Sequence, residues 1–200
     1  MQTIAFLYAF GSPNAYLAHK VLGGIAARNG ARVAYLPVLL GGVFKATNNQ
    51  SPMDAFAGVT GKLDYQRTET NRFVERHAIP YRFNPHFPVM TMGVMRGAVY
   101  AQGHSWEQTY IDAVFDAMGV DGHKMDDPSV ITEVLGAADL PAREIIEAAQ
   151  SSDVKSGLIE ATQTAVHRGT FGSPTMFVGD EMFYGKDSLV DLEWRLSATA

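Results

Sequence analysis

The sequence places a serine followed by a proline, Ser12-Pro13, directly after its first apolar run, residues 4–10. Such a run is typical of a strand covered on both faces, and a serine before a proline is typical of a helix N-cap. A helix N-terminus has unpaired backbone N–H groups and favours an anion. The Ser12 hydroxyl could therefore donate a hydrogen bond to an anionic group, or it could act only as a cap. The G-x-S-x-G elbow of a serine hydrolase does not surround it.

A second serine–proline pair, Ser173-Pro174, precedes a short apolar run, residues 175–178. A proline at the start of a strand commonly does no more than mark its boundary. A cis Ser173-Pro174 bond would instead expose the backbone N–H and C=O of Ser173 to a ligand. The residues alone leave both forms open.

A charged pair, Lys186-Asp187, stands before the last predicted helix, residues 188–196. An Asp or Ser at the start of a helix is most often a cap. A lysine and an aspartate beside a helix N-terminus could also bind the carboxylate and the ammonium of an amino acid. The sequence leaves both interpretations open.

The composition excludes several classes of function. The 200 residues contain no cysteine, which excludes disulfides, thiolate metal sites, cysteine nucleophiles and redox chemistry by the protein's own thiols. The net charge of −5 gives no support to a nucleic-acid partner. The six histidines lack the spacing of a local metal site, so we expect no metal. No Walker or G-x-G-x-x-G loop indicates nucleotide binding.

The hydropathy pattern gives no sign of a membrane protein. No apolar run approaches the roughly eighteen residues that a spanning helix needs, and the N-terminus lacks the positive region of a signal peptide. We therefore expect a cytoplasmic enzyme or binding protein that does not contact a membrane.

The chain begins with a strand–helix–strand pattern that would position Ser12. Residues 4–10 and 32–38 predict two strands. Between them, apolar residues recur every four positions after Pro13, and Gly30 is expected to cap the helix. Such a unit favours two parallel strands in an α/β sheet.

A long helical region separates this unit from a final hairpin. Residues 41–49 predict a loop, and the proline-rich residues 81–88 predict an extended connector. The predicted helices cover residues 62–77, 91–102, 106–118, 129–138, 141–150 and 153–167. Residues 175–178 and 181–184 predict two strands joined by a two-residue turn. The helical block therefore looks inserted into a small α/β domain.

Six groups of sequence motifs contain these candidate residues or lie between them in the sequence. They are Phe10-Gly11-Ser12-Pro13 with Tyr16-Leu17, Gly41-Gly42-Val43-Phe44-Lys45-Ala46-Thr47 with Asn49, Lys62-Leu63-Asp64-Tyr65, Asn84-Pro85-His86-Phe87-Pro88, Met95-Arg96-Gly97, and Gly172-Ser173-Pro174-Thr175 with Phe183-Tyr184-Gly185-Lys186-Asp187. Over roughly residues 4–190, the chain resembles the 2-hydroxychromene-2-carboxylate isomerases. These belong with the kappa-class glutathione transferases to the DsbA-type branch of the thioredoxin-like fold.

The resemblance implies an α/β fold in which a thioredoxin-like domain, residues 1–48 and 169–200, carries an inserted all-helical domain, residues 49–168. It also implies that Ser12 stands where oxidoreductase relatives have the first cysteine of C-x-x-C. The strand after Pro174 should then face Ser12, and we therefore predict a cis Ser173-Pro174 bond. Because this chain has no cysteine, a sulfur nucleophile must be borrowed, and glutathione is the source in this family.

The resemblance further implies a role for each candidate residue. Ser12 would be the catalytic residue that lowers the pKa of the glutathione thiol. The glutathione-binding residues would be Asn49 and Lys62 at the glycine end, Ser173 with Pro174 at the cysteinyl backbone, and Lys186 with Asp187 at the γ-glutamyl end. The chain departs from the family pattern at four positions expected to surround the aromatic substrate: Ala9, Asn14, Ala15 and Met90.

Three functions agree with these residues. The first is a glutathione-dependent isomerase of the 2-hydroxychromene-2-carboxylate type, which acts on a small aromatic substrate by addition and elimination of a thiolate. The second is a kappa-like glutathione transferase that conjugates electrophiles. The third is a non-catalytic thioredoxin-like binding module in which Ser12 is only a cap. A homodimer is compatible with each of them.

Overall fold

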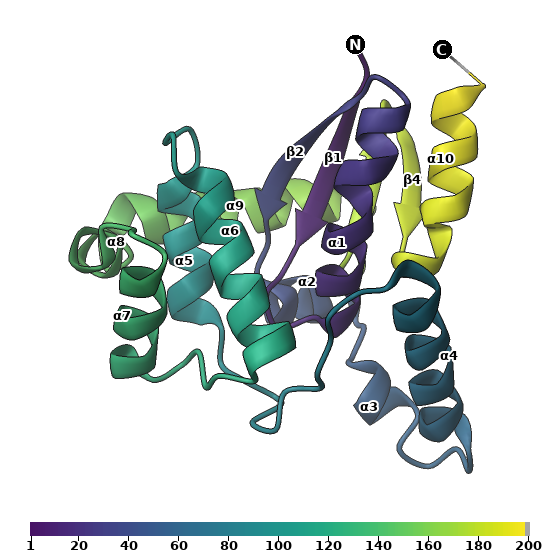
Figure 1. Ribbon diagram of the computed structural model, residues 1–200, viewed down its shortest axis with the longest axis horizontal. Coiled ribbons are helices and arrows are strands. Elements are labelled where there is room, and N and C mark those ends of the chain that lie inside the picture. The colour runs from purple at the N-terminus through teal and green to yellow at the C-terminus, as the bar shows by residue number, and fades with distance from the viewer. Residues whose placement is uncertain (199–200) are drawn as a thin grey trace.

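The computed structural model describes residues 1–198, and a four-stranded mixed sheet lies at its centre (Figure 1). The strand order is β2-β1-β3-β4. The first strand, β1 (Thr3–Tyr8), pairs in parallel with β2 (Arg32–Pro37) and antiparallel with β3 (Thr175–Val178). Strand β3 in turn pairs antiparallel with β4 (Glu181–Tyr184). Both ends of the chain therefore contribute to one sheet.

Strand β1 connects the two halves of this sheet. Ala5 lies opposite Ala34 of β2 on one side and opposite Phe177 of β3 on the other. Helix α1 (Pro13–Arg28) returns the chain from the end of β1 to the start of β2. The predicted parallel strand–helix–strand unit is confirmed, and so is the hairpin that β3 and β4 form.

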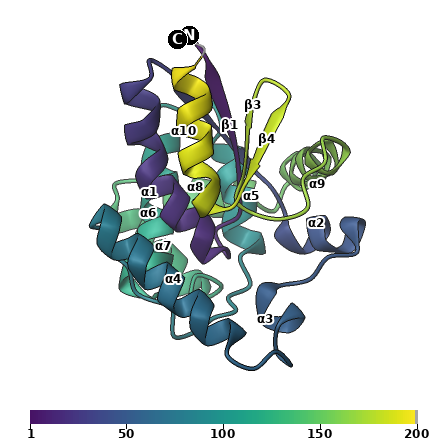
Figure 2. The same cartoon turned by 90° about the vertical axis from the view of Figure 1, so that its right-hand side faces the viewer.

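Helices cover both faces of the sheet. Figure 2 shows α1 and α10 (Leu189–Ser197) on one side, and α9 (Ser152–His167) with α2 (Leu40–Thr47) on the other. Because side chains alternate along a strand, Phe6 enters the core under α1 while Leu7 packs toward α2 and α9.

The helical region lies between β2 and β3 in the sequence. Its remaining elements are α3 (Pro52–Ala55), α4 (Lys62–His77), α5 (Met92–Ala101), α6 (Glu107–Asp116), a π-helical turn (Ala117–Asp121), α7 (Pro128–Ala137) and α8 (Ala142–Ala148). Helices α5 to α8 gather beside β2, whereas α3 and α4 lie on the other side of α1 (Figure 1). Within residues 1–198, no helix has the length and apolar character needed to cross a membrane.

One expectation about local structure is wrong. Residues 41–49 were expected to form a loop, but they lie largely within helix α2. Two glycines weaken the helical signal there, yet Val43 is fully buried and the backbone at Gly42 closely approaches the Thr162 methyl of α9. Gly30 ends α1 as expected. It follows Asn29 in the left-handed conformation, with φ of 59°, and its N–H donates to the carbonyl of Ala27.

His19 of α1 connects the sheet to the helical region. Its Nδ1 lies 2.8 Å from the Tyr35 hydroxyl of β2, and its Nε2 lies 3.0 Å from Oδ1 of Asp112 on α6. Burial tends to raise the pKa of Asp112, but hydrogen bonds from His19 and Gln108 hold that pKa below its ordinary value. The ring of His19 also stacks on Phe115. Polar and aromatic contacts therefore join α1, β2 and α6 at one point.

We predict that Gly97→Ala destabilises the protein by about 1–3 kcal/mol, because overpacking a filled core has that cost. A Cβ at Gly97 would lie 2.2 Å from the Tyr110 hydroxyl, which donates a hydrogen bond to the carbonyl of Val94. Gly93 of the same helix has open space around it, so Gly93→Ala is the matched control and should leave stability unchanged or slightly increased. Urea unfolding measures both, and equal midpoints for the two variants would contradict this packing account.

Candidate active site

The Ser12 hydroxyl lies where the end of β1 meets the N-terminus of α1. Its Oγ accepts a hydrogen bond from the backbone N–H of Ala15 at 3.2 Å, so Ser12 is the N-cap of α1. The same hydroxyl donates to the carbonyl oxygen of Ser173 at 2.8 Å. Because Ser12 is only 6% exposed, both contacts are shielded from water. The residue is thus a cap that also reaches across to the other end of the chain.

The loop before β3 is held against this helix N-terminus. The backbone N–H of Ala9 donates to Ser173 Oγ at 3.0 Å, and the Ser173-Pro174 bond is cis, as predicted. The carbonyl of Pro174 accepts from the N–H of Gly185 at 3.0 Å. The structure therefore brings Ser12, Ser173 and Pro174 together.

Lys186 and Asp187 follow Gly185 in a short 3-10 turn (Lys186–Ser188). The Lys186 ammonium lies 2.7 Å from both carboxylate oxygens of Asp187 and 5.0 Å from the centre of the Phe73 ring on α4. The side chain of Lys186 is 5% exposed, whereas that of Asp187 is 76% exposed. The lysine is thus covered by the protein, and the aspartate reaches solvent.

Asn49 and Lys62 lie on two other segments. Asn49 follows α2, and its side-chain amide donates to the carbonyl of Phe171 at 2.8 Å, two residues before Ser173. Lys62 begins α4, and its ammonium lies 5.3 Å from the centre of the Phe56 ring. Asn49 is thus tied to the Ser173 loop, whereas no contact found within residues 1–198 joins Lys62 to Ser12 or Ser173.

A narrow pocket opens beside Ser12. Aromatic and apolar side chains dominate its wall, including Phe10, Tyr16, Tyr81, Phe87 and Met118. Its volume of about 20 Å³ holds roughly one water molecule, so a larger ligand must displace some of these side chains. The wall suits a flat apolar ring next to a single hydroxyl.

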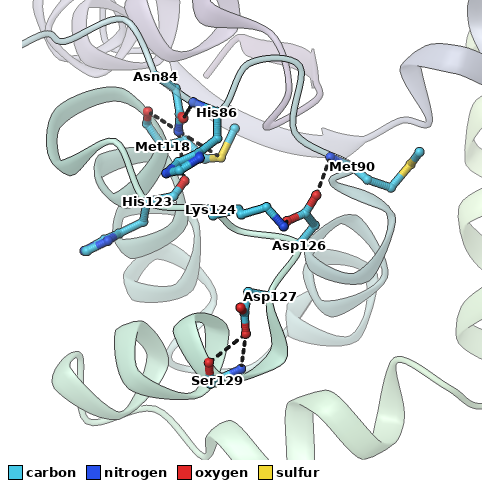
Figure 3. Close-up of polar contacts among 9 residues, drawn as sticks. All are labelled: Asn84, His86, Met90, Met118, His123, Lys124, Asp126, Asp127 and Ser129. Atoms are coloured by element: carbon cyan, nitrogen blue, oxygen red, sulfur yellow. Dashed lines mark hydrogen bonds and ion pairs between the residues drawn. The ribbon is translucent and has the colours of Figure 1, made fainter.

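Asn84 is part of the wall of this pocket, and Figure 3 shows its polar contacts. Its buried amide nitrogen donates to the carbonyls of Met118 and His123, at 3.2 and 2.9 Å, and its Oδ1 accepts from the backbone N–H of His86 at 2.9 Å. The predicted connector is thus extended but rigidly attached to the π-helical turn. The sequence analysis did not predict that this segment forms part of the pocket wall, because proline-rich segments are typical of connectors. The Asn84-Pro85 motif was the one available signal.

Tyr16 contributes a ring rather than an acid or base. Burial, reinforced by the nearby Asp116 and Asp121 carboxylates, raises the pKa of its hydroxyl well above the ordinary value. The hydroxyl donates to the carbonyl of Pro80. A Cβ at Gly119 would lie 2.8 Å from the Tyr16 ring, so only a glycine allows this close contact. No group of three or more metal-binding side chains occurs in residues 1–198.

A parallel β-α-β unit continued by an antiparallel hairpin, with Ser12 facing the Ser173-Pro174 loop, defines a protein of the thioredoxin class. Comparisons with known proteins agree. The family model for the DsbA-like thioredoxin domain matches residues 3–197. A solved structure of a 2-hydroxychromene-2-carboxylate isomerase superposes with a TM-score of 0.87 at 28% identity, covering 98% of this chain and 95% of that one.

Curated relatives narrow the assignment. The 2-hydroxychromene-2-carboxylate isomerase of Pseudomonas sp. (strain C18) is 33% identical over 194 residues, covering 95% of this chain and 88% of the relative. The enzyme of the same name from Pseudomonas putida is 31% identical, covering 95% of this chain and 92% of the relative. The chain belongs to the DsbA-like thioredoxin family and, within it, to the family of the 2-hydroxychromene-2-carboxylate isomerases.

We predict that Ser173→Ala lowers the free energy of unfolding by about 1–3 kcal/mol, because the buried N–H of Ala9 would lose its acceptor. Ser156 on α9 is an exposed serine whose hydroxyl bonds within its own helix, so Ser156→Ala is the control and should change stability by less than about 0.5 kcal/mol. Denaturant titration decides, and two variants of equal stability would mean that the Ala9–Ser173 hydrogen bond contributes nothing.

Proposed function

We propose that the protein is a glutathione-dependent isomerase that acts on 2-hydroxychromene-2-carboxylate or a close analogue. The observation that carries the proposal is the Ser12 hydroxyl at the N-terminus of α1, in a chain without cysteine. The curated relatives that match this chain over nearly their whole length are named for this reaction. A thiol that is not the protein's own is then required, and glutathione is the thiol that the family resemblance implies.

The surroundings of Ser12 suit a thiolate. A free thiol has a pKa near 8.5, so most of it is protonated at neutral pH. The dipole of α1 and a hydroxyl donor both stabilise the anion and lower that pKa. The hydroxyl has one proton, with which it donates a hydrogen bond to the carbonyl of Ser173 in this structure. Rotation of the hydroxyl would redirect this proton to the sulfur, and the freed carbonyl would accept the N–H of the cysteinyl residue.

The other residues suit the two ends of the tripeptide. The carboxylate of Asp187 reaches solvent and would accept hydrogen bonds from the ammonium of the γ-glutamyl residue. The buried ammonium of Lys186 is paired with the same carboxylate. Lys62, which has no carboxylate partner within residues 1–198, would bind the glycine carboxylate, and Asn49 would flank it.

Glutathione, held by the residues named above, would supply the thiolate for reversible addition to the conjugated double bond of the opened substrate. The protein's part would be to keep the Ser12 hydroxyl donating a hydrogen bond to the sulfur and to orient the substrate ring against Tyr16, Tyr81 and Phe87. No proton is gained or lost overall, so Ser12 need only donate a hydrogen bond, and no strong base is required beside it.

We predict that purified protein interconverts the two isomers when glutathione is far less concentrated than substrate, and that glutathione is recovered unchanged. Chromatography of substrate, product and free thiol over time measures both. Calorimetry should show saturable glutathione binding, and the bound state should gain about 2.7 kcal/mol of stability at a hundred times Kd.

Two outcomes would contradict the proposal. Consumption of one glutathione for each substrate molecule would indicate a transferase that releases a conjugate. No heat of binding and no thermal shift at high glutathione concentration would indicate a binding module in which Ser12 is only a cap.

A further inference from the structure

The pocket beside Ser12 has one residue with a formal charge in its wall, Arg82. The other side chains that form this wall are the rings and apolar groups described above, the Ser12 hydroxyl and the amide of Asn84. The Asn84 amide is already used by backbone partners. Arg82 is thus the group in the wall that could recognise a charged ligand.

The backbone of Arg82 is held in place. Its N–H donates to the carbonyl of Gly119 at 2.6 Å, and Asn84, two residues later, fastens the same segment to the π-helical turn (Figure 3). A Cβ at Gly122 would lie 3.8 Å from the guanidinium carbon of Arg82 and 2.9 Å from Cδ of Pro85. The guanidinium therefore lies near the bare backbone of Gly122, beside the pocket.

The guanidinium of Arg82 has no acidic partner among residues 1–198. None of the ion pairs within residues 1–198 includes Arg82, although Lys20 and Lys124, from neighbouring segments, are both paired with aspartates. Arg82 is also exposed, so an anion can reach it from solvent. A cation without an acidic partner in the described structure, on a segment whose backbone is held beside an aromatic pocket, suits a ligand that has a ring and a negative charge.

We propose that Arg82 is the specificity-determining residue that binds the carboxylate of the substrate. The proposal rests on the proposed function, which places an aromatic carboxylate in this pocket. A guanidinium offers two parallel N–H donors that match the two oxygens of a carboxylate, which a single ammonium cannot reproduce. The ligands that this site takes are therefore flat conjugated acids, and uncharged analogues of the same shape bind weakly.

Binding of 2-hydroxycinnamate and of its amide, measured by calorimetry with glutathione present, tests the proposal. Wild-type protein should bind the acid about ten- to a hundredfold more tightly than the amide, in keeping with a charge-assisted hydrogen bond. Arg82→Met keeps the length of the side chain and should abolish this preference. Arg82→Lys should restore only part of it. The control Arg143→Met removes an exposed arginine of α8 that is paired with Glu147, and it should keep the full preference.

The outcomes separate this proposal from the reaction itself. A preference for the acid that survives in Arg82→Met, or equal binding of acid and amide by the wild type, overturns the role of Arg82 even if isomerisation is observed. Loss of the preference in Arg82→Met, with glutathione affinity unchanged, supports it even if isomerisation is not observed. A preference fully kept in Arg82→Lys would show that charge alone, and not the forked guanidinium, is recognised, and would overturn the claim of paired donors.

Discussion

The hydrogen bond from the Ser12 hydroxyl to the carbonyl of Ser173 joins residues 161 positions apart, and the candidate site depends on it. It exists because β1 pairs with β3, which brings the segment after β1 and the loop before β3 to the same edge of the sheet. The reciprocal bond from the N–H of Ala9 to the Ser173 hydroxyl fixes the distance between the two segments. Both bonds are buried, where an unpaired partner would cost about 1–3 kcal/mol. The two ends of the chain are thereby held in one geometry, around a helix N-terminus that favours an anion.

Under the proposed function, this geometry accounts for a serine at the position where the resemblance implies a cysteine in oxidoreductase relatives. In that proposed function, the hydroxyl would turn its one proton from the carbonyl of Ser173 to an incoming anion and would still accept the N–H of Ala15 as the helix cap. The helical region then supplies the second half of the site. Its π-helical turn contributes Met118 and Gly119 to the pocket wall, the Asn84 amide donates to the carbonyl of Met118, and Gly119 lies in close contact with the Tyr16 ring. Nucleophile and substrate would thus be positioned by different parts of the chain.

Most of the fold could be predicted from local signals. The Ser-Pro start of α1, the hairpin between β3 and β4 and the helix Lys62–His77 follow from caps, turn residues and charge pattern, and the structure has them where they were expected. Helix α2 was missed because its stability comes from packing of Val43 and Gly42 against α9, which a local reading cannot detect. The Ser12–Ser173 contact followed only from the family resemblance. The wall formed by Tyr81 and Arg82 was not foreseen, since it depends on where Asn84 finds carbonyl partners 34 and 39 residues away.

The most direct test of this account is the thiolate absorbance of bound glutathione as a function of pH, in wild-type protein and in Ser12→Ala. A charge-assisted hydrogen bond contributes roughly 1.5–3 kcal/mol, so the account predicts that the substitution raises the pKa of the bound thiol by about one to two units. Near neutral pH, this would leave about ten- to a hundredfold less thiolate, with recovery of activity at higher pH. Loss of the helix cap alone would lower stability by about 1 kcal/mol and leave the titration unchanged. Superimposable titration curves would therefore contradict the claim that Ser12 activates the thiol.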